Sequence, residues 1–183
     1  MPVKPRIPTP ASEHRVFPLA GLELRYAAGP GVIRLHGHAA VFDAVTDIGR
    51  HRERISRGAF KDTISRDDIR ALINHDPQYV LGRNKSGTLK LAEDEKGLAV
   101  EINLPDTTYA RDLLESIRRG DVSQMSIGFR TVQDSFDKDG VRTLEKLKLF
   151  DVSPVTFPAY PETDVKIRGT RLERLRSRLE LEA

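Results

Sequence analysis

Three residue types that can act together in nucleophilic chemistry occur far apart in this chain. A serine, Ser126, lies within residues 120–129, a histidine, His75, lies upstream of it, and an aspartate, Asp151, lies downstream. A serine hydroxyl is a weak nucleophile until a base takes its proton, and a third group commonly orients that base. The three residues are therefore a candidate catalytic set, provided that the fold brings them together.

Two serines, Ser123 and Ser126, compete for the role of nucleophile. The residues around them are predicted to form a strand, in which successive side chains point to opposite faces. Ser126 then shares a face with Gly128, which we expect to leave open space beside the hydroxyl. Ser123 falls with Met125 on the apolar face and is expected to be a hydrogen-bonded core residue. The alternation favours Ser126, although the segment is not the Gly-x-Ser-x-Gly turn of α/β-hydrolases.

The candidate base, His75, follows an apolar pair and so stands at the end of a predicted buried element. Such a position holds the backbone while the imidazole reaches a cleft. A lone histidine is more often structural, so its partners decide the matter. Asp151 ends a predicted strand, where its carboxylate would accept a hydrogen bond from the ring and set the tautomer. Asp76 is a rival for this role, and Glu101 and Glu145 are weaker candidates.

A second pair of histidines, His36 and His38, shares one face of a predicted strand, as metal ligands can. Asp43 lies nearby, but no carboxylate is spaced to complete a ligand set. A structural role, or a role in the wall of a substrate site, is favoured over metal binding. The chain has no cysteine and no phosphate-binding loop or dinucleotide fingerprint, so we expect no metal and no cofactor.

The composition is that of a soluble globular domain with polar appendages, because 38% of the residues are hydrophobic and 31% are charged. No apolar run approaches the roughly 20 residues that span a bilayer, and the N-terminus lacks the apolar region of a secretory signal. The net charge is only +3, and the 6% of aromatic residues do not interleave with the basic ones. We therefore expect neither a membrane protein nor a specific nucleic-acid binder.

The elements that must position these residues are mainly short strands. Alternation of apolar and polar residues predicts strands over residues 22–26, 32–42, 71–75, 79–83, 88–92, 98–104, 122–132 and 142–152. Helices are predicted near residues 58–60, with Ser56 as the N-cap, and over residues 107–119, with Gly120 as the C-cap. Neighbouring hairpins favour an α+β, mainly β fold. We expect a mostly antiparallel sheet, closed or partly closed into a barrel, with helices around it.

The chain is predicted to divide into three parts. Residues 1–20, with four prolines before Phe17, are predicted to be a flexible Pro-rich arm. Residues 21–166 are predicted to be the folded domain, in which residues 50–57 form a charged connector. Residues 167–183, rich in arginine and glutamate, are predicted to be a charged tail, helical or disordered.

Five short motifs occur in an order that carries a family resemblance. They are GHAAVFD at residues 37–43, ERISRGAF at 53–60, LINHDP at 72–77, MSIGF at 125–129 and DVSPVTFPAYP at 151–161. Together they resemble the prohead, or capsid maturation, serine proteases of tailed phages, over about residues 22–166. Each motif is short, but five of them in the same order are specific.

The resemblance implies a fold related to that of the herpesvirus assembly protease, a β-barrel core with surrounding helices, and makes residues 21–166 a serine protease domain. It implies a serine endopeptidase that cleaves the scaffolding part of the major capsid protein, and itself, during prohead maturation. The enzyme would act inside the procapsid of a phage or prophage, assembled in the cytoplasm of the bacterial host. A homodimer is a further expectation from the resemblance to the herpesvirus enzymes.

The resemblance also assigns roles to residues. The histidine of the family matches His75, its serine matches Ser126, and its acidic residue, often glutamate, matches Asp151. Because aspartate reaches about one methylene less far than glutamate, Asp151 matches the family less closely than the other two residues do. In related viral enzymes a second histidine takes the third role, so His36 and His38 remain alternatives. The alternative function is a non-catalytic assembly or scaffold module on a degenerate protease fold, against which a complete set of His, Ser and acid argues.

Overall fold

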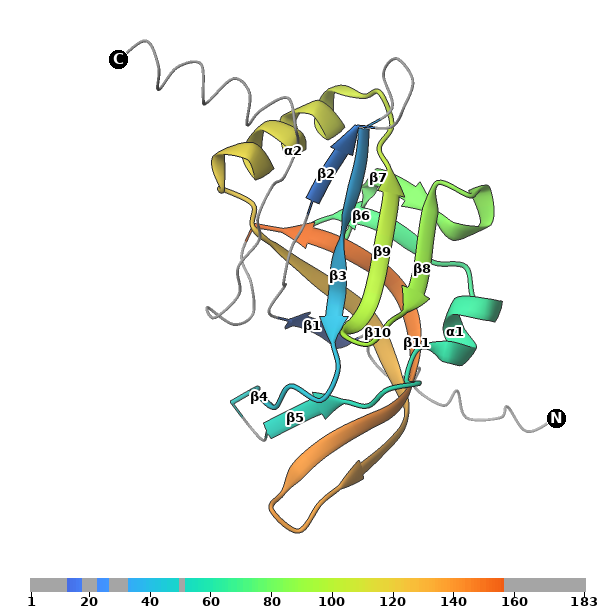
Figure 1. The fold of residues 1–183 in the computed structure, drawn as a ribbon, viewed down its shortest axis with the longest axis vertical. Helices are drawn as coiled ribbons and strands as arrows, with labels where there is room; N and C mark the ends of the chain where they lie inside the picture. Colours follow the sequence, from blue (N-terminus) through green and yellow to red (C-terminus); the bar gives the residue numbers. More distant parts are fainter. Residues whose placement is uncertain (1–12, 18–22, 27–32, 50–51, 157–183) are drawn as a thin grey trace, which may run out of the picture.

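The computed structural model describes residues 13–17, 23–26, 33–49 and 52–156 (Figure 1). Its strands are β1 (Glu13–Phe17), β2 (Glu23–Tyr26), β3 (Ile33–Val41), β4 (Thr46–Asp47), β5 (Arg52–Ile55), β6 (Arg70–Ile73), β7 (Asp76–Arg83), β8 (Leu89–Glu93), β9 (Gly97–Asn103), β10 (Gln124–Phe136) and β11 (Val141–Val155). Its helices are α1 (Lys61–Arg66) and α2 (Thr108–Arg119), and a single 3-10 turn, η1, covers Asn84–Ser86. In this part of the chain no helix is long and apolar enough to cross a membrane.

The strands form two sheets. The larger has seven strands in the order β1-β10-β11-β5-β4, with β6 paired to β11 and β7 paired to β6, and the smaller has the order β2-β3-β9-β8. All pairs are antiparallel except those of β5 and β6 with β11. The mainly β class is therefore confirmed. A closed barrel is not, because β3 of the small sheet lies against β10 of the large one without ladder hydrogen bonds between them.

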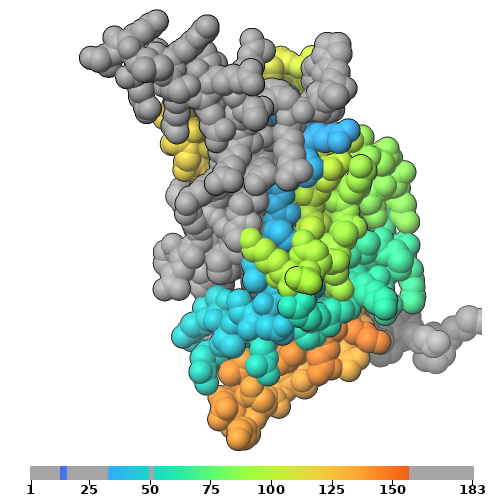
Figure 2. Space-filling view, viewed as in Figure 1, coloured from blue at the N-terminus to red at the C-terminus, as the bar shows by residue number. Residues whose placement is uncertain are grey.

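The hairpin of β10 and β11 is the longest feature of the large sheet and runs from its middle to the lower end of the molecule (Figure 1). In the space-filling view its far end (orange) lies directly below the side chains of β4 and β5 (Figure 2). Its other end is buried on both faces, over residues 124–129 of β10 and 151–155 of β11. Burial on both faces makes this end the most constrained part of the sheet, and Ser126 and Asp151 lie in it.

Helix α2 leads into β10 and follows the sequence prediction closely. The Thr107 hydroxyl accepts a hydrogen bond from the Ala110 N–H at the first turn, and Gly120 ends the helix with φ +82°. Its buried side chains, Ala110, Leu113 and Ile117, lie on one face at helical spacing. Apolar periodicity and both end signals agreed here, which is why local sequence was sufficient.

Two segments differ from their sequence predictions because tertiary pairing, not local pattern, sets their structure. Residues 13–17, expected in the flexible Pro-rich arm, form β1 and pair with β10 along their whole length. Residues 52–55, expected in a charged connector, form β5 and bury Glu53 and Ile55 against β11. The rest of the predicted arm and the predicted tail over residues 167–183 lie outside the described residues.

The predicted N-cap of the first helix was wrong. Helix α1 begins at Lys61 with Phe60 at its N-cap position. Ser56 does not cap it, because the Ser56 hydroxyl donates instead to the carbonyl oxygen of Leu144 on β11, at 3.1 Å.

We expect Thr107→Ala to lower the free energy of unfolding by about 1 kcal/mol, because one N–H of the first turn of α2 loses its acceptor. Thr108→Ala is the matched control, since Thr108 is the first helical residue and its side chain is not the cap. Urea unfolding followed by circular dichroism measures both. Equal losses in the two variants would contradict the capping role of Thr107.

Candidate active site

The fold brings His75, Ser126 and Asp151 into one hydrogen-bonded chain. His75 Nε2 lies 2.7 Å from Ser126 Oγ, and His75 Nδ1 lies 2.6 Å from Asp151 Oδ1. The three residues are separated by 51 and 76 positions in the chain, so only the tertiary structure joins them. Of the two serines considered from sequence, Ser126 is the one that reaches the imidazole.

Ladder pairing between β10 and β11 sets the relative positions of the serine and the aspartate. Ser126 pairs with Ser153, and Gly128 pairs with Asp151 two residues further along. Asp151 is thus a diagonal neighbour of Ser126 across the strand pair, which leaves room for one imidazole ring between them. The Ser153 hydroxyl donates to Asp151 Oδ1 at 2.6 Å and helps to hold that carboxylate in place.

Gly128 makes room for the aspartate. A Cβ atom on residue 128 would lie 2.2 Å from Asp151 Oδ2, far inside van der Waals contact. The prediction of open space beside the serine was therefore wrong, because the Asp151 carboxylate fills the space that the missing Cβ of Gly128 leaves. Sequence alternation along one strand could not reveal this, because the occupant comes from the neighbouring strand.

His75 is held in the turn between β6 and β7. Asn74 and His75 both have left-handed backbone conformations, with φ 52° and 59°, which are uncommon for residues other than glycine. The Asn74 N–H donates to the Pro154 carbonyl at 2.9 Å, and the Asn74 side-chain oxygen accepts from the Thr156 N–H at 2.8 Å. These bonds fasten the turn to the end of β11. The strand that carries Asp151 therefore also fixes the backbone beside His75.

Ser123 does not lie on the apolar strand face that was predicted for it. Strand β10 begins at Gln124, so Ser123 precedes it. Residues 124–129 are buried on both faces, and Ser126 itself is 0% exposed. The preference for Ser126 agrees with the geometry for another reason, which is its contact with His75.

The other candidate acids are engaged elsewhere. The carboxylate of Asp76 accepts from the Gln78 N–H at 2.9 Å, within its own turn. Glu145 accepts from the side chains of Gln133 and Ser135 on the far half of the hairpin.

The two histidines of β3 also face acids of the small sheet. His36 Nε2 lies 3.6 Å from Glu101, and His38 Nε2 lies 2.7 Å from Asp94. Burial opposes ionisation of Asp94, but the hydrogen bond from His38 and those from backbone N–H groups outweigh it and lower its pKa. Within the described ranges no three His, Asp or Glu side chains cluster in a way that could hold a metal ion.

Strand β1 lies against the same site, which sequence reasoning missed. Ser126 Oγ is 3.2 Å from the carbonyl oxygen of Arg15, and the ring of His14 meets that of His75 edge to face, with centroids 4.2 Å apart. Partial burial and the neighbouring His75 lower the pKa of His14 from its ordinary 6.5. No periodic pattern in residues 13–17 marks this strand, so the sequence held little signal for it.

The three-residue arrangement is suited to activating the serine. If His75 Nδ1 carries its proton toward Asp151, Nε2 is left as an acceptor for the Ser126 proton. The carboxylate then stabilises the imidazolium that forms as the proton moves. This geometry supports nucleophilic attack by Ser126 on an electrophilic carbonyl.

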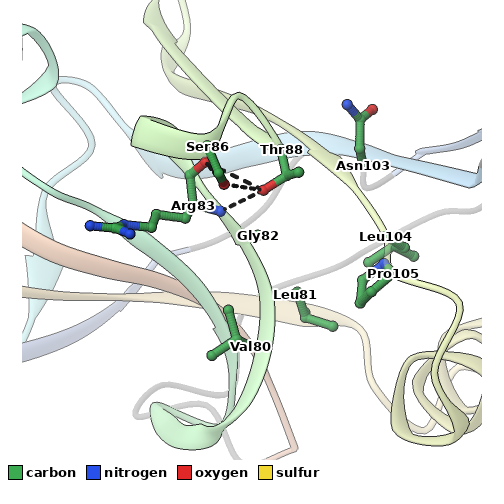
Figure 3. A pocket seen from close by; sticks show the side chains of 9 residues that line it. All are labelled: Val80, Leu81, Gly82, Arg83, Ser86, Thr88, Asn103, Leu104 and Pro105. Carbon is green, nitrogen blue, oxygen red and sulfur yellow. Dashed lines mark hydrogen bonds between the residues drawn. The ribbon is translucent and has the colours of Figure 1, made fainter.

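A pocket of about 620 Å³ lies elsewhere, between β7 and the loop after β9 (Figure 3). Val80, Leu81, Leu104 and Pro105 form much of its lining, and Thr88 accepts a hydrogen bond from the Arg83 N–H at its rim. None of the three residues of the hydrogen-bonded chain lines it. The pocket is therefore separate from the candidate active site.

Comparisons with known proteins identify the family and a similar fold. A family model described as caudovirus prohead serine protease matches residues 21–178. Among solved structures, the bacteriophage T4 capsid assembly protease, gp21, has a similar fold, with a TM-score of 0.52 and 12% sequence identity over 79% of this chain and 96% of that one. No curated protein matches the chain. The family resemblance noted in the sequence is confirmed.

We expect Gly128→Ala to separate His75 from Asp151, because the new methyl group needs the place of the carboxylate. Proton NMR of the histidine side chains measures this directly. We expect the unchanged protein to show a low-field Nδ1–H resonance from His75, and Gly128→Ala to lose or shift it. Ser123→Ala is the control and should leave the resonance unchanged. An unaltered resonance in Gly128→Ala would contradict the packing described for Gly128.

Proposed function

The chain belongs to the family of caudovirus prohead serine proteases, and from that premise we propose that Ser126, His75 and Asp151 are its catalytic triad. The observation that carries the proposal is the continuous hydrogen-bonded chain from Ser126 Oγ through the imidazole to Asp151. The same three positions stand in the motifs shared with the family. The reaction is hydrolysis of a peptide bond through an acyl-enzyme.

In the first step Ser126 Oγ attacks the scissile carbonyl carbon while His75 Nε2 takes the hydroxyl proton. The C–N bond breaks as His75 returns that proton to the leaving amine. In the second step water attacks the acyl carbon while His75 takes its proton. The ester C–O bond then breaks as His75 returns that proton to Ser126 Oγ, which releases the new carboxyl terminus and regenerates the serine. Asp151 stabilises the imidazolium in both steps and is not itself protonated.

Asp151 is the third member because it reaches the imidazole in spite of its short side chain. The missing Cβ of Gly128 lets the carboxylate lie close against β10, and the turn of His75 is fastened to the same strand as Asp151. The loss of one methylene relative to glutamate is thereby compensated. His36 and His38 are disfavoured because each faces an acid of the small sheet.

The proposed substrate is the scaffolding part of the major capsid protein, with self-cleavage as a second event, inside the procapsid during assembly in the bacterial host. The family description names the prohead, and the protein of similar fold is a capsid assembly protease of bacteriophage T4. A homodimer stays a prediction from the herpesvirus relatives. A non-catalytic scaffold module is disfavoured, because a degenerate protease has no reason to retain all three groups in hydrogen-bonding geometry.

We expect Ser126→Ala to fold normally and to lose cleavage of the co-expressed capsid protein by at least about a thousandfold, because the acyl-enzyme cannot form. Ser123→Ala is the matched control, a serine three positions away that should cleave at the normal rate. Mass spectrometry of the capsid protein detects the new N-terminus. Normal processing by Ser126→Ala would refute the assignment of the nucleophile.

A second substitution tests the acid. Asp151→Asn keeps the size of the side chain but offers no negative charge to the imidazolium, so the cleavage rate should fall by about ten-thousandfold. His38→Ala should leave the rate within a few-fold of the unchanged enzyme. The reverse result, with His38 essential and Asp151 replaceable, would assign the third role to the second histidine.

A further inference from the structure

The serine proposed as nucleophile is covered by the chain's own N-terminal strand. Strand β1 pairs antiparallel with the end of β10, from Glu13 opposite Phe129 to Phe17 opposite Met125. Val16 stands opposite Ser126, which is 0% exposed. An enzyme that cleaves other proteins must bind their chains beside this serine. In the described conformation β1 occupies that position and blocks access to Ser126.

The contacts of β1 are with the reacting groups themselves. The carbonyl oxygen of Arg15 lies 3.2 Å from Ser126 Oγ, while His75 Nε2 lies 2.7 Å from the same atom. The hydroxyl has one proton, so the Arg15 carbonyl competes with the imidazole for it. The oxygen of this carbonyl, not its carbon, faces the hydroxyl, which makes β1 a poor substrate in this pose. His14 in addition packs its ring against that of His75.

An ion pair anchors the strand. Arg15 Nε donates to Glu53 Oε1 at 2.9 Å, and the guanidinium lies over the ring of Phe129, 5.6 Å from its centroid. Glu53 is only 2% exposed, and Arg142 Nη1 also contacts it, at 3.1 Å. A carboxylate buried to this extent is costly unless cations accompany it. The position beside the Glu53 carboxylate that Arg15 fills, here called the seat at Glu53, therefore favours a basic side chain on any strand that lies along β10.

We propose that the edge of β10 beside Ser126 is a binding site for an extended peptide that carries an arginine or lysine for the seat at Glu53, and that β1 fills it as an internal inhibitor. An extended peptide can add to an exposed sheet edge through main-chain hydrogen bonds, while side-chain seats give selectivity. Because β1 belongs to the same chain, its effective concentration at this edge is high, on the order of millimolar. A substrate must displace it. This inference rests on the proposed function, which it extends to the choice of peptide.

The test compares the full-length chain with Arg15→Glu, in which the anchor becomes a repulsive contact with Glu53. Two readouts are taken: hydrogen exchange of residues 124–129 by mass spectrometry, and the rate at which a small fluorophosphonate labels Ser126. We expect both to rise at least about tenfold in Arg15→Glu, because β1 leaves the edge. Arg15→Gln removes the positive charge without placing a second carboxylate beside Glu53. It should raise both readouts by a smaller factor, and it serves if Arg15→Glu misfolds. Arg54→Glu is the matched control, since Arg54 bonds to Thr143 and Asp137 on the same sheet and not to β1.

Peptides added to Arg15→Glu test the seat. A synthetic peptide of residues 11–19 should slow exchange and labelling again, and the same peptide with glutamate in place of Arg15 should not. Equal effects of the two peptides would overturn the preference for a basic side chain. If the unchanged protein exchanges and labels as fast as Arg15→Glu, β1 does not guard the site, and the inference fails while the protease proposal stands. If exchange and peptide binding respond as expected but Ser126 is labelled in no variant, the serine chemistry fails while the occupied edge stands.

Discussion

The close approach of Asp151 to the backbone of Gly128 is the contact on which the rest of the site depends. Strands β10 and β11 pair these two residues directly, and only a residue without a Cβ leaves the carboxylate its place. The carboxylate then lies within reach of the imidazole, which in turn reaches Ser126. A rigid strand pair, buried on both faces at this end, holds two of the three groups without help from loops.

The third group depends on the same strand by a different route. His75 sits in a strained turn, and strain of this kind persists only where the surroundings determine the conformation. Here the bonds of Asn74 to the backbone of Pro154 and Thr156 do so, at the end of β11. Asp151 and His75 are therefore both held in place by β11, which fixes their positions relative to each other. Such preorganisation is what catalysis by a triad requires.

Local sequence predicted the elements whose signals are local. Helix α2 had apolar periodicity and both end residues, and most strands had alternation. The three residues of the candidate site could also be singled out from sequence, because they lie in motifs that resemble those of a family. What escaped prediction arises between strands. Sequence alternation predicted that Gly128 leaves space beside Ser126, but it could not show that Asp151 of the paired strand fills this space. Strand β1 and strand β5 take their structure from pairing with β10 and β11, which no local pattern encodes.

In the proposed mechanism Ser126 forms a covalent intermediate with the capsid protein. Stopping the reaction with acid and searching the enzyme by mass spectrometry for a capsid-derived acyl group would detect this intermediate. We expect an ester on Ser126 whose acyl part ends at the cleavage site and which disappears as the product accumulates. Cleavage without any such ester, or with an ester on another residue, would contradict it.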